Sequence, residues 1–292
     1  MSNILPNTLI IGAMKASTTL LYQLLDQHPD VFMPDVKEPH YFTSKAYGNP
    51  DAWRDYLHLF AGAGKARIVA EASTGYAKVP RLGPTPQRIA SDLGCPKIVY
   101  ILRDPVERTI SNYRHNFGTG RYDDGMTLTE AIESDPIILA ASRYAEQIHA
   151  YQAEFGPEAV HVMVAEQLHK DHFAELTDLA DFLEIEPLEA WRGPLPTVNS
   201  AAQVAWSDTA DRYISAPWRR RFGLYLPGMI KHWVKSKMAR PATSPEPVTD
   251  EERRRVLELI GDDLLSLHES LGERIELWPS MQRLSQLQEE QG

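Results

Sequence analysis

A lysine and three hydroxyl side chains stand directly after a short apolar run near the start of the chain. The segment reads GAMKASTT over Gly12–Thr19, and leucines at helical spacing follow it. The first turn of a helix presents unpaired N–H groups and a partial positive charge, which together bind anions. A lysine ammonium and neighbouring hydroxyls add a point charge and further hydrogen-bond donors. The segment therefore predicts a phosphate-binding loop made of Lys15, Ala16, Ser17, Thr18 and Thr19.

The spacing of this loop differs from that of a nucleoside-triphosphate loop. That motif, G-x-x-x-x-G-K-S/T, needs a second glycine directly before the lysine. Here Lys15 comes three residues after Gly12, with no glycine between them. A magnesium-binding aspartate is also missing where a later strand should end, because the run Lys97–Leu102 leads into Arg103. The pattern disfavours a nucleotide-dependent kinase, which stays an alternative.

A second candidate anion site lies at mid-chain, around Arg103 and Ser111. Arg103 stands between the apolar run KIVYIL (Lys97–Leu102) and a helix start, at the rim where ligands bind in open α/β sheets. Ser111 follows eight residues later, in the second turn of that helix. An arginine fork with a hydroxyl suits a phosphate. Two anion sites on neighbouring strand ends suggest a nucleotide with a phosphate at each end of its ribose.

Buried strands and amphipathic helices must position these residues, and the two alternate along the chain. Alternation of this kind predicts an α/β fold with a central parallel sheet flanked by helices. Short apolar, β-branched runs predict strands at Thr8–Ala13, Ile68–Ala70, Lys97–Leu102 and Val160–Ala165. Helical patterns begin at Leu20, Pro105, Ser142, His172 and Thr249.

Two of these helix starts carry the pattern of a capping box. Asp104 and Glu107 form one, with Pro105 at the first helical position, and Thr249 and Glu252 form the other. The last helix has an apolar stripe that ends before Gly272, a suitable C-terminal cap. We expect this helix to dock on the rest of the domain over residues 249–277.

Composition limits the classes of protein that the chain can be. Its 292 residues include 43% hydrophobic and 24% charged residues, which excludes a disordered chain or a fibre. The net charge of −10 argues against a nucleic-acid binder. Cys95 is the only cysteine, so no intrachain disulfide can form. Neither a signal peptide nor a membrane-spanning run is visible, and we expect a soluble, cytoplasmic protein.

The stretch from Arg212 to Arg240 is basic and rich in aromatic residues. It admits three interpretations: a solvated surface helix, part of a lid that closes over a nucleotide, or a peripheral membrane contact that meets a lipid-linked or anionic acceptor. From Arg212 to Pro245 there are no acidic residues and eight basic ones: Arg212, Arg219, Arg220, Arg221, Lys231, Lys235, Lys237 and Arg240.

The two anion motifs together resemble the sulfotransferases that use 3'-phosphoadenosine 5'-phosphosulfate (PAPS). GAMKASTT and LRDPVERTISNY, about ninety residues apart, carry this resemblance. KEPHYF (Lys37–Phe42), EASTGY (Glu71–Tyr76) and the segment Ser142–Leu168 are similar to the carbohydrate, heparan-sulfate-like branch, with a bacterial-type cytoplasmic member expected. The resemblance implies one P-loop-like domain over 1–292. Its parts are a nucleotide-binding core at 8–184, a lid or linker at 197–247 and the docked helix.

The resemblance also implies a role for each candidate residue. The loop at Lys15–Thr19 would hold the 5'-phosphosulfate, and Arg103 with Ser111 the 3'-phosphate. Because lysine and arginine neutralise the charge, no metal is expected. Glu38 in KEPHYF would be the base, with a pKa that nearby anions raise, and Lys15 would stabilise the leaving oxygen. His40 is the competing base. The expected acceptor contacts are Lys37, Glu71 and Ser73; Glu71 has the alternative of tying a strand end to a loop.

Three positions depart from the pattern of these sulfotransferases. Ser17 replaces a usual glycine, Ala72 stands where many relatives place a lysine, and the segment 197–206 lacks a basic residue that Arg212 or Arg219 would have to replace. The implied reaction moves sulfate from PAPS to a hydroxyl, or less readily an amine, of a carbohydrate, glycolipid or secondary metabolite, leaving adenosine 3',5'-bisphosphate (PAP). A non-catalytic nucleotide-binding scaffold is the alternative from another class. The acceptor and the oligomeric state are not readable from the sequence.

Overall fold

The computed structural model describes residues 4–196 and 245–291, and they fall into two compact units. The first unit comprises Met1–Thr109, Leu139–Val198 and Val256–Gly292, and the second comprises Ile110–Ile138 and Asn199–Arg255. The predicted lid or linker at 197–247 lies outside the described residues except for 245–247. That the chain forms one domain therefore stays a prediction.

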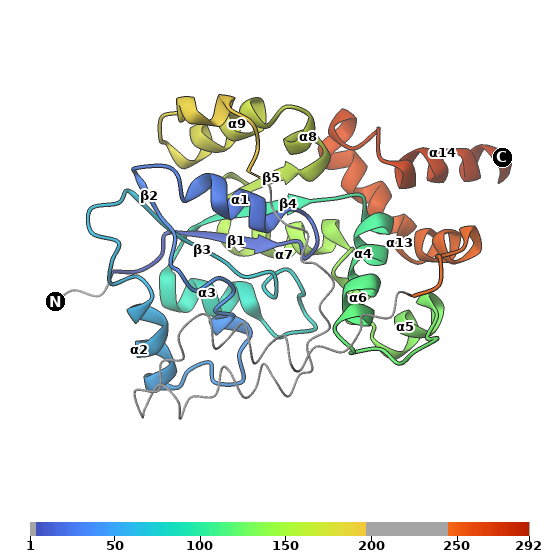
Figure 1. The fold of residues 1–292 in the computed structure, drawn as a ribbon, viewed down its shortest axis with the longest axis horizontal. Helices are drawn as coiled ribbons and strands as arrows, with labels where there is room; N and C mark the ends of the chain where they lie inside the picture. Colours follow the sequence, from blue (N-terminus) through green and yellow to red (C-terminus); the bar gives the residue numbers. More distant parts are fainter. Residues whose placement is uncertain (1–3, 197–244, 292) are drawn as a thin grey trace. The chain divides into compact units, whose positions relative to one another are not determined.

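The first unit is built on a five-stranded sheet in which every pair of neighbouring strands is parallel (Figure 1). The spatial order is β2-β3-β1-β4-β5. This confirms the predicted parallel sheet and all four predicted strands. The sequence does not predict β2, because its two residues are too short an apolar run to indicate a strand. The strands are β1 (Thr8–Gly12), β2 (Val31–Phe32), β3 (Ile68–Ala72), β4 (Lys97–Leu102) and β5 (Val160–Val164).

Helices of the first unit cover both faces of the sheet. In Figure 1, α1, α8 and α9 lie over one face, and α3 and α7 lie over the other. The helices of this unit are α1 (Thr18–Leu25), α2 (Pro50–His58), α3 (Thr85–Leu93), α7 (Tyr144–Phe155), α8 (Ala165–Lys170), α9 (His172–Leu183) and α14 (Pro279–Gln291). Short 3₁₀ turns span Tyr41–Thr43, Pro157–Ala159, Glu189–Arg192 and Gly272–Arg274.

The second unit contains α5 (Leu128–Ser134). Three further helices have residues in both units: α4 (Pro105–Gly118), α6 (Ile137–Ala140) and α13 (Asp250–Leu271). In the described part of the chain, no helix is long and apolar enough to cross a membrane.

The core between the sheet and the helices α1 and α9 follows from the period-2 and period-3.6 patterns. Ile10, Val99 and Ile101 alternate along β1 and β4 and pack with Leu21 of α1 and Leu176 of α9. All five are fully buried. Because burial of one such side chain contributes about 1.5–3 kcal/mol, this layer fixes α1 against the sheet. The loop that precedes α1 is fixed with it.

The direction of winding reverses between β1 and β4. From β1 the chain runs to one side, to β2 and β3, and then crosses to β4 on the other side of β1. In open α/β sheets, ligands bind where the direction of winding reverses in this way. The predicted phosphate loop follows β1 and Arg103 follows β4, so both stand at this point of the sheet.

The start of α4 is capped by Asp104, although not by the predicted box. Asp104 Oδ1 accepts the N–H groups of Val106 at 2.9 Å and Glu107 at 3.0 Å, as expected of an N-cap. The N–H of Asp104, however, donates to Glu166 Oε1 at 3.0 Å rather than to Glu107. Asp104 Oδ2 also accepts the N–H of Ser280 at 2.9 Å. The buried Asp104 thus links three segments behind Arg103.

The capping box at the start of α13 is confirmed. The N–H of Glu252 donates to Thr249 Oγ1 at 3.2 Å, and the N–H of Thr249 donates to Glu252 Oε2 at 2.9 Å. The helix ends at Leu271, and Gly272 follows with a φ of 50°, the left-handed conformation typical of a C-terminal cap.

Candidate active site

The predicted phosphate loop connects β1 to α1 and meets Arg103. Ser17 is the N-cap residue of α1 and is left-handed, and its hydroxyl makes no capping hydrogen bond to the helix. Arg103 Nη1 donates to the carbonyl oxygen of Lys15 at 3.3 Å. The two strand ends that were predicted to hold anions are therefore in direct contact. Of the loop residues, Ala16 and Thr18 are buried, whereas Lys15 and Ser17 are half-buried and Thr19 is exposed.

Positive charge is concentrated at this edge of the sheet. Burial lowers the pKa of Lys15, and the guanidinium of Arg103 lowers it further. Lys37 Nζ donates to Thr19 Oγ1 at 2.5 Å, and burial lowers the pKa of Lys37, an effect that the charge of Glu38 opposes. Cations that are partly buried beside each other repel, and a bound anion relieves that repulsion. The loop is therefore suited to a multiply charged anion.

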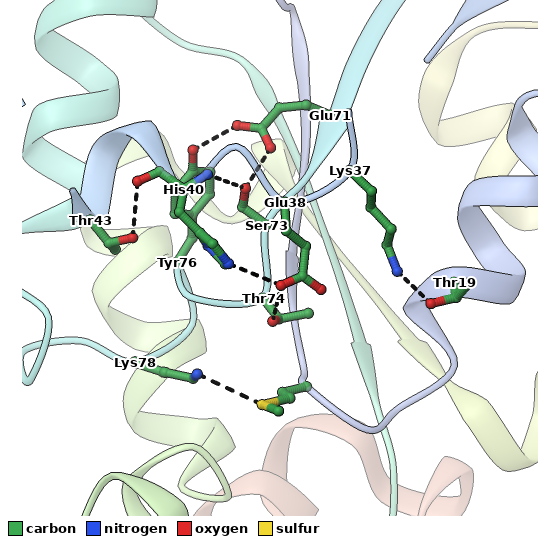
Figure 2. A network of polar contacts seen from close by, with 11 residues as sticks. Thr19, Lys37, Glu38, His40, Thr43, Glu71, Ser73, Thr74, Tyr76 and Lys78 are labelled. Carbon is green, nitrogen blue, oxygen red and sulfur yellow. Dashed lines mark hydrogen bonds and ion pairs between the residues drawn. The ribbon is translucent and has the colours of Figure 1, made fainter. Parts of the chain in front are cut away.

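The side chains of Glu38 and His40 are in contact beside this loop (Figure 2). His40 Nε2 lies 2.9 Å from Glu38 Oε2, and Thr74 Oγ1 donates to the same oxygen at 3.2 Å. The N–H of Glu38 donates to the carbonyl oxygen of Ala72 at 2.9 Å, which ties this segment to the end of β3. Both predicted candidates for the base are thus in contact, and Thr74 is a partner that the sequence did not reveal.

The pKa of Glu38 lies below its usual value in this structure. Burial raises the pKa, but the hydrogen bond and charge of His40, the charge of Lys37 and the hydroxyl of Thr74 together lower it more. From the sequence, bound anions are expected to raise the pKa of Glu38. The protein groups alone lower it instead. Glu38 is ionised at neutral pH and can accept a proton without first losing one.

Glu71 and Ser73 lie inside the protein, which differs from the expected contact with an acceptor. Both are fully buried, and Glu71 accepts hydrogen bonds from Tyr76 at 2.7 Å, Ser73 at 2.8 Å and Tyr56 at 3.2 Å. Ser73 Oγ in turn accepts the N–H of His40 at 3.1 Å. Burial raises the pKa of Glu71, and these hydroxyl donors lower it in part. Figure 2 shows the resulting chain of hydrogen bonds. The network ties the end of β3 to the segment of His40. This corresponds to the alternative role of Glu71, in which it ties a strand end to a loop.

Strained backbone gathers at the same residues. A positive φ costs a non-glycine residue about 1–2 kcal/mol, and such conformations cluster at functional sites. In the part of the chain that the structure describes, five non-glycine residues have a positive φ, and four of them belong to the loop or to the Glu38–His40 pair: Lys15 (73°), Ser17 (65°), Glu38 (58°) and His40 (52°). The fifth is Glu184.

Two further observations concern residues outside this group. Ser111 lies half-buried on the part of α4 that belongs to the second unit, so its pairing with Arg103 stays a prediction. His169 on α8 lies 3.0 Å from Ser17 Oγ, a contact that no sequence pattern predicts because 152 residues separate the two. Among the described residues, no three His, Cys, Asp or Glu side chains gather as they would in a metal site.

Comparisons with known proteins agree with this site. A profile of the sulfotransferase domain family matches residues 5–193. The membrane-associated sulfotransferase kil1 of Dictyostelium discoideum is 34% identical over 110 residues, which are 37% of this chain and 22% of that protein. Heparan sulfate glucosamine 3-O-sulfotransferase 3B1 of Mus musculus is 29% identical over 190 residues, 62% of this chain and 47% of that protein. The matches thus span less than half the length of either relative.

The fold has a solved counterpart. A sulfotransferase from Alicyclobacillus acidocaldarius superposes with a TM-score of 0.65 at 23% identity, covering 94% of this chain and 99% of that one. A likeness at this identity supports the fold alone. The family profile covers more than half of the chain, including the loop, the Glu38–His40 pair and Arg103. The chain belongs to the sulfotransferase domain family.

Proposed function

We propose that this protein transfers the sulfuryl group of PAPS to a hydroxyl group of a carbohydrate-type acceptor. The observation that carries the proposal is the hydrogen bond from Lys37 to Thr19, because it joins the segment holding Glu38 to the anion loop. A carboxylate free to take a proton thereby stands next to a loop suited to a phosphosulfate. The family assignment supports the same donor.

The donor, when bound, supplies a sulfuryl group on a phosphate leaving group. In the proposed mechanism, Lys15 and the N–H groups at the start of α1 hold the 5' end, and Arg103 with Ser111 holds the 3'-phosphate. Glu38 accepts the proton of the acceptor hydroxyl, and Lys15 neutralises charge on the leaving oxygen. His40 orients the Glu38 carboxylate through the 2.9 Å contact. Lys37, half-buried beside this pair, remains the proposed acceptor contact.

The acceptor class rests on the relatives. One matched relative is named for 3-O-sulfation of heparan sulfate glucosamine, and another, from Drosophila melanogaster, for N-deacetylation and N-sulfation of heparan sulfate. We therefore place carbohydrate hydroxyls first, with amines, glycolipids and secondary metabolites as further acceptors to screen.

Calorimetric titration with PAP, with ATP plus magnesium as the comparison, tests the proposal. Micromolar, metal-independent binding of PAP is the expected result. Binding of ATP with magnesium alone would favour the kinase alternative instead. PAP binding without sulfuryl transfer to any acceptor of a carbohydrate panel would favour the non-catalytic scaffold.

Replacing Arg103 should weaken PAP binding about 10–100-fold, since hydrogen bonds to charged groups contribute about 1.5–3 kcal/mol. Arg103→Ala is compared with Arg54→Ala, because Arg54 is an exposed residue of α2 paired only with Asp51 in the described contacts. The loss should be smaller for adenosine 5'-monophosphate, which lacks the 3'-phosphate. An equal loss for both nucleotides would contradict the assignment of Arg103 to the 3'-phosphate.

A methyl group added at Gly75 should impair turnover by displacing His40. A Cβ on Gly75 would lie 2.8 Å from His40 Nδ1, closer than carbon and nitrogen approach without movement. We expect Gly75→Ala to lower kcat about tenfold, because small displacements of catalytic groups are costly. PAP affinity should be unchanged. Gly118→Ala is the control, since its Cβ would meet no atom within 4 Å. Unaltered kcat in Gly75→Ala would argue against a role for the His40 position.

A further inference from the structure

Ser17 uses its hydroxyl in an unusual way for a residue at the start of a helix. A serine at this position normally accepts a hydrogen bond from the N–H of the second or third helical residue. Ser17 makes no such bond, is left-handed, and directs its Oγ toward His169 Nε2 at 3.0 Å. A left-handed position favours glycine, which has no Cβ. A serine at this position therefore carries a conformational strain that a glycine would not.

His169 reaches this loop from the last turn of α8. The helix spans Ala165–Lys170 and directly follows β5, whose neighbour in the sheet is β4. The imidazole of His169 is exposed, and Ser17 is half-buried beside it. The contact thus brings a titratable donor from a third strand end to the anion loop.

The direction of this hydrogen bond decides where the hydroxyl proton of Ser17 points. If the hydroxyl donates to Nε2, its proton faces the imidazole. If Nε2–H donates to Oγ, the hydroxyl proton is free to be donated elsewhere. An imidazole with Nε2 protonated permits only the second arrangement, and an imidazolium, in which both ring nitrogens are donors, does the same. A phosphate at the start of α1 favours the second arrangement, because a phosphate oxygen can then accept a hydrogen bond from the Ser17 hydroxyl.

We propose that His169 is a positioning residue for the donor nucleotide: it donates to Ser17 Oγ and so directs the Ser17 hydroxyl toward the 5'-phosphate group. The inference rests on the proposed function, since it assigns a role within the PAPS site. It gives Ser17 a contact that glycine, the residue this backbone conformation favours, cannot make. It also gives α8 a part in donor binding.

The test uses two ligands that differ at the 5' end. PAP carries the 5'-phosphate and adenosine 3'-monophosphate lacks it, and calorimetry gives the affinity of each. His169→Phe retains a ring but no donor, and it should weaken PAP binding about fivefold, the factor that corresponds to one net hydrogen bond. Binding of adenosine 3'-monophosphate should not change. His169→Gln keeps an N–H donor near the position of Nε2 and should bind PAP nearly as the wild type does.

A second variant separates positioning from general damage to the loop. In a Ser17→Gly background, His169→Phe should have no further effect, because the hydroxyl that it orients is gone. His149→Phe, at an exposed position of α7, is the matched control. Equal weakening of both ligands, or a fivefold effect that persists without Ser17, would overturn the inference. If the wild type failed to bind PAP at all, the proposed function itself would fail, which is a distinguishable result.

Discussion

Glu38→Gln is expected to lower kcat for sulfuryl transfer by at least ~100-fold and to leave PAP affinity unchanged. General base catalysis contributes about 10²–10⁴-fold, and an amide cannot take the proton of the acceptor hydroxyl. The substitution preserves size, and the 3.2 Å contact with Thr74 can persist through the amide oxygen. The loss should therefore appear in kcat, and the thermal stability of the variant should stay close to that of the wild type.

The pH dependence separates Glu38 from His40 as the base. Because the neighbouring protein groups hold the pKa of Glu38 below its ordinary value, an acid limb that reports Glu38 is expected well below the pH at which a free imidazole titrates. An imidazole base instead loses activity as the pH falls through about 6.5, the pKa of unperturbed histidine. The profile of kcat/KM for the acceptor distinguishes the two. His40→Gln should reduce kcat less than Glu38→Gln does. A reversal of this order would make His40 the base.

Local patterns were enough to predict the sheet and the position of the candidate phosphate loop. KIVYIL coincides with β4, and the leucines after Thr19 give α1, because alternation and helical spacing are properties of short segments. The strand ends then follow, and with them the positions of Lys15 and Arg103. Parallel strands bring their carboxyl ends to one edge, so residues about ninety positions apart could be assigned to one site without a structure.

The environment of each candidate side chain could not be predicted in this way. Glu71 stands at a strand end and carries a charge, features typical of a binding residue, yet two tyrosines close over it. Tyr56 comes from α2, and nothing in the sequence says that its hydroxyl reaches β3. The left-handed conformations of Glu38 and His40 flank a proline, which ordinarily favours an extended residue before it. Such conformations depend on tertiary contacts, here with Ala72 and Ser73.

Burial and neighbouring charges shift the pKa values of Glu71 and Glu38 in opposite directions. Glu71 is enclosed and hydrogen-bonded by hydroxyl donors, and burial raises its pKa. Glu38 is only half-buried and has cationic neighbours, so its pKa is lowered. Opposite shifts in neighbouring carboxyl groups are a recurrent way to separate a structural role from a proton-transfer role. The Ser73 hydroxyl connects the two, since it donates to Glu71 and accepts from His40.

Lys15→Met is expected to lower kcat about 100–1000-fold and to weaken PAP binding by a smaller factor. The methionine side chain has a similar length but no charge. The substitution therefore removes the ammonium and preserves most of the packing in the loop. Donors and cations aimed at charge that develops in the transition state contribute about 10²–10³ in kcat. Ground-state binding suffers less, because Arg103 and the N–H groups of α1 remain. Burial and Arg103 already lower the pKa of Lys15, and a bound phosphate opposes both effects by favouring the charged ammonium.

Two comparisons make this expectation specific to Lys15. Lys37→Met removes a second half-buried ammonium, which donates to Thr19, and should reduce kcat by a smaller factor because that side chain is not assigned to the leaving oxygen. Lys65→Met, at an exposed position, should change neither kcat nor the affinity for PAP. A transfer reaction with an arylsulfate donor, whose leaving group differs, should respond less to Lys15→Met than the reaction with PAPS does. If Lys15→Met and Lys37→Met lowered kcat equally, the charge of the whole edge, and not the Lys15 ammonium, would stabilise the leaving oxygen.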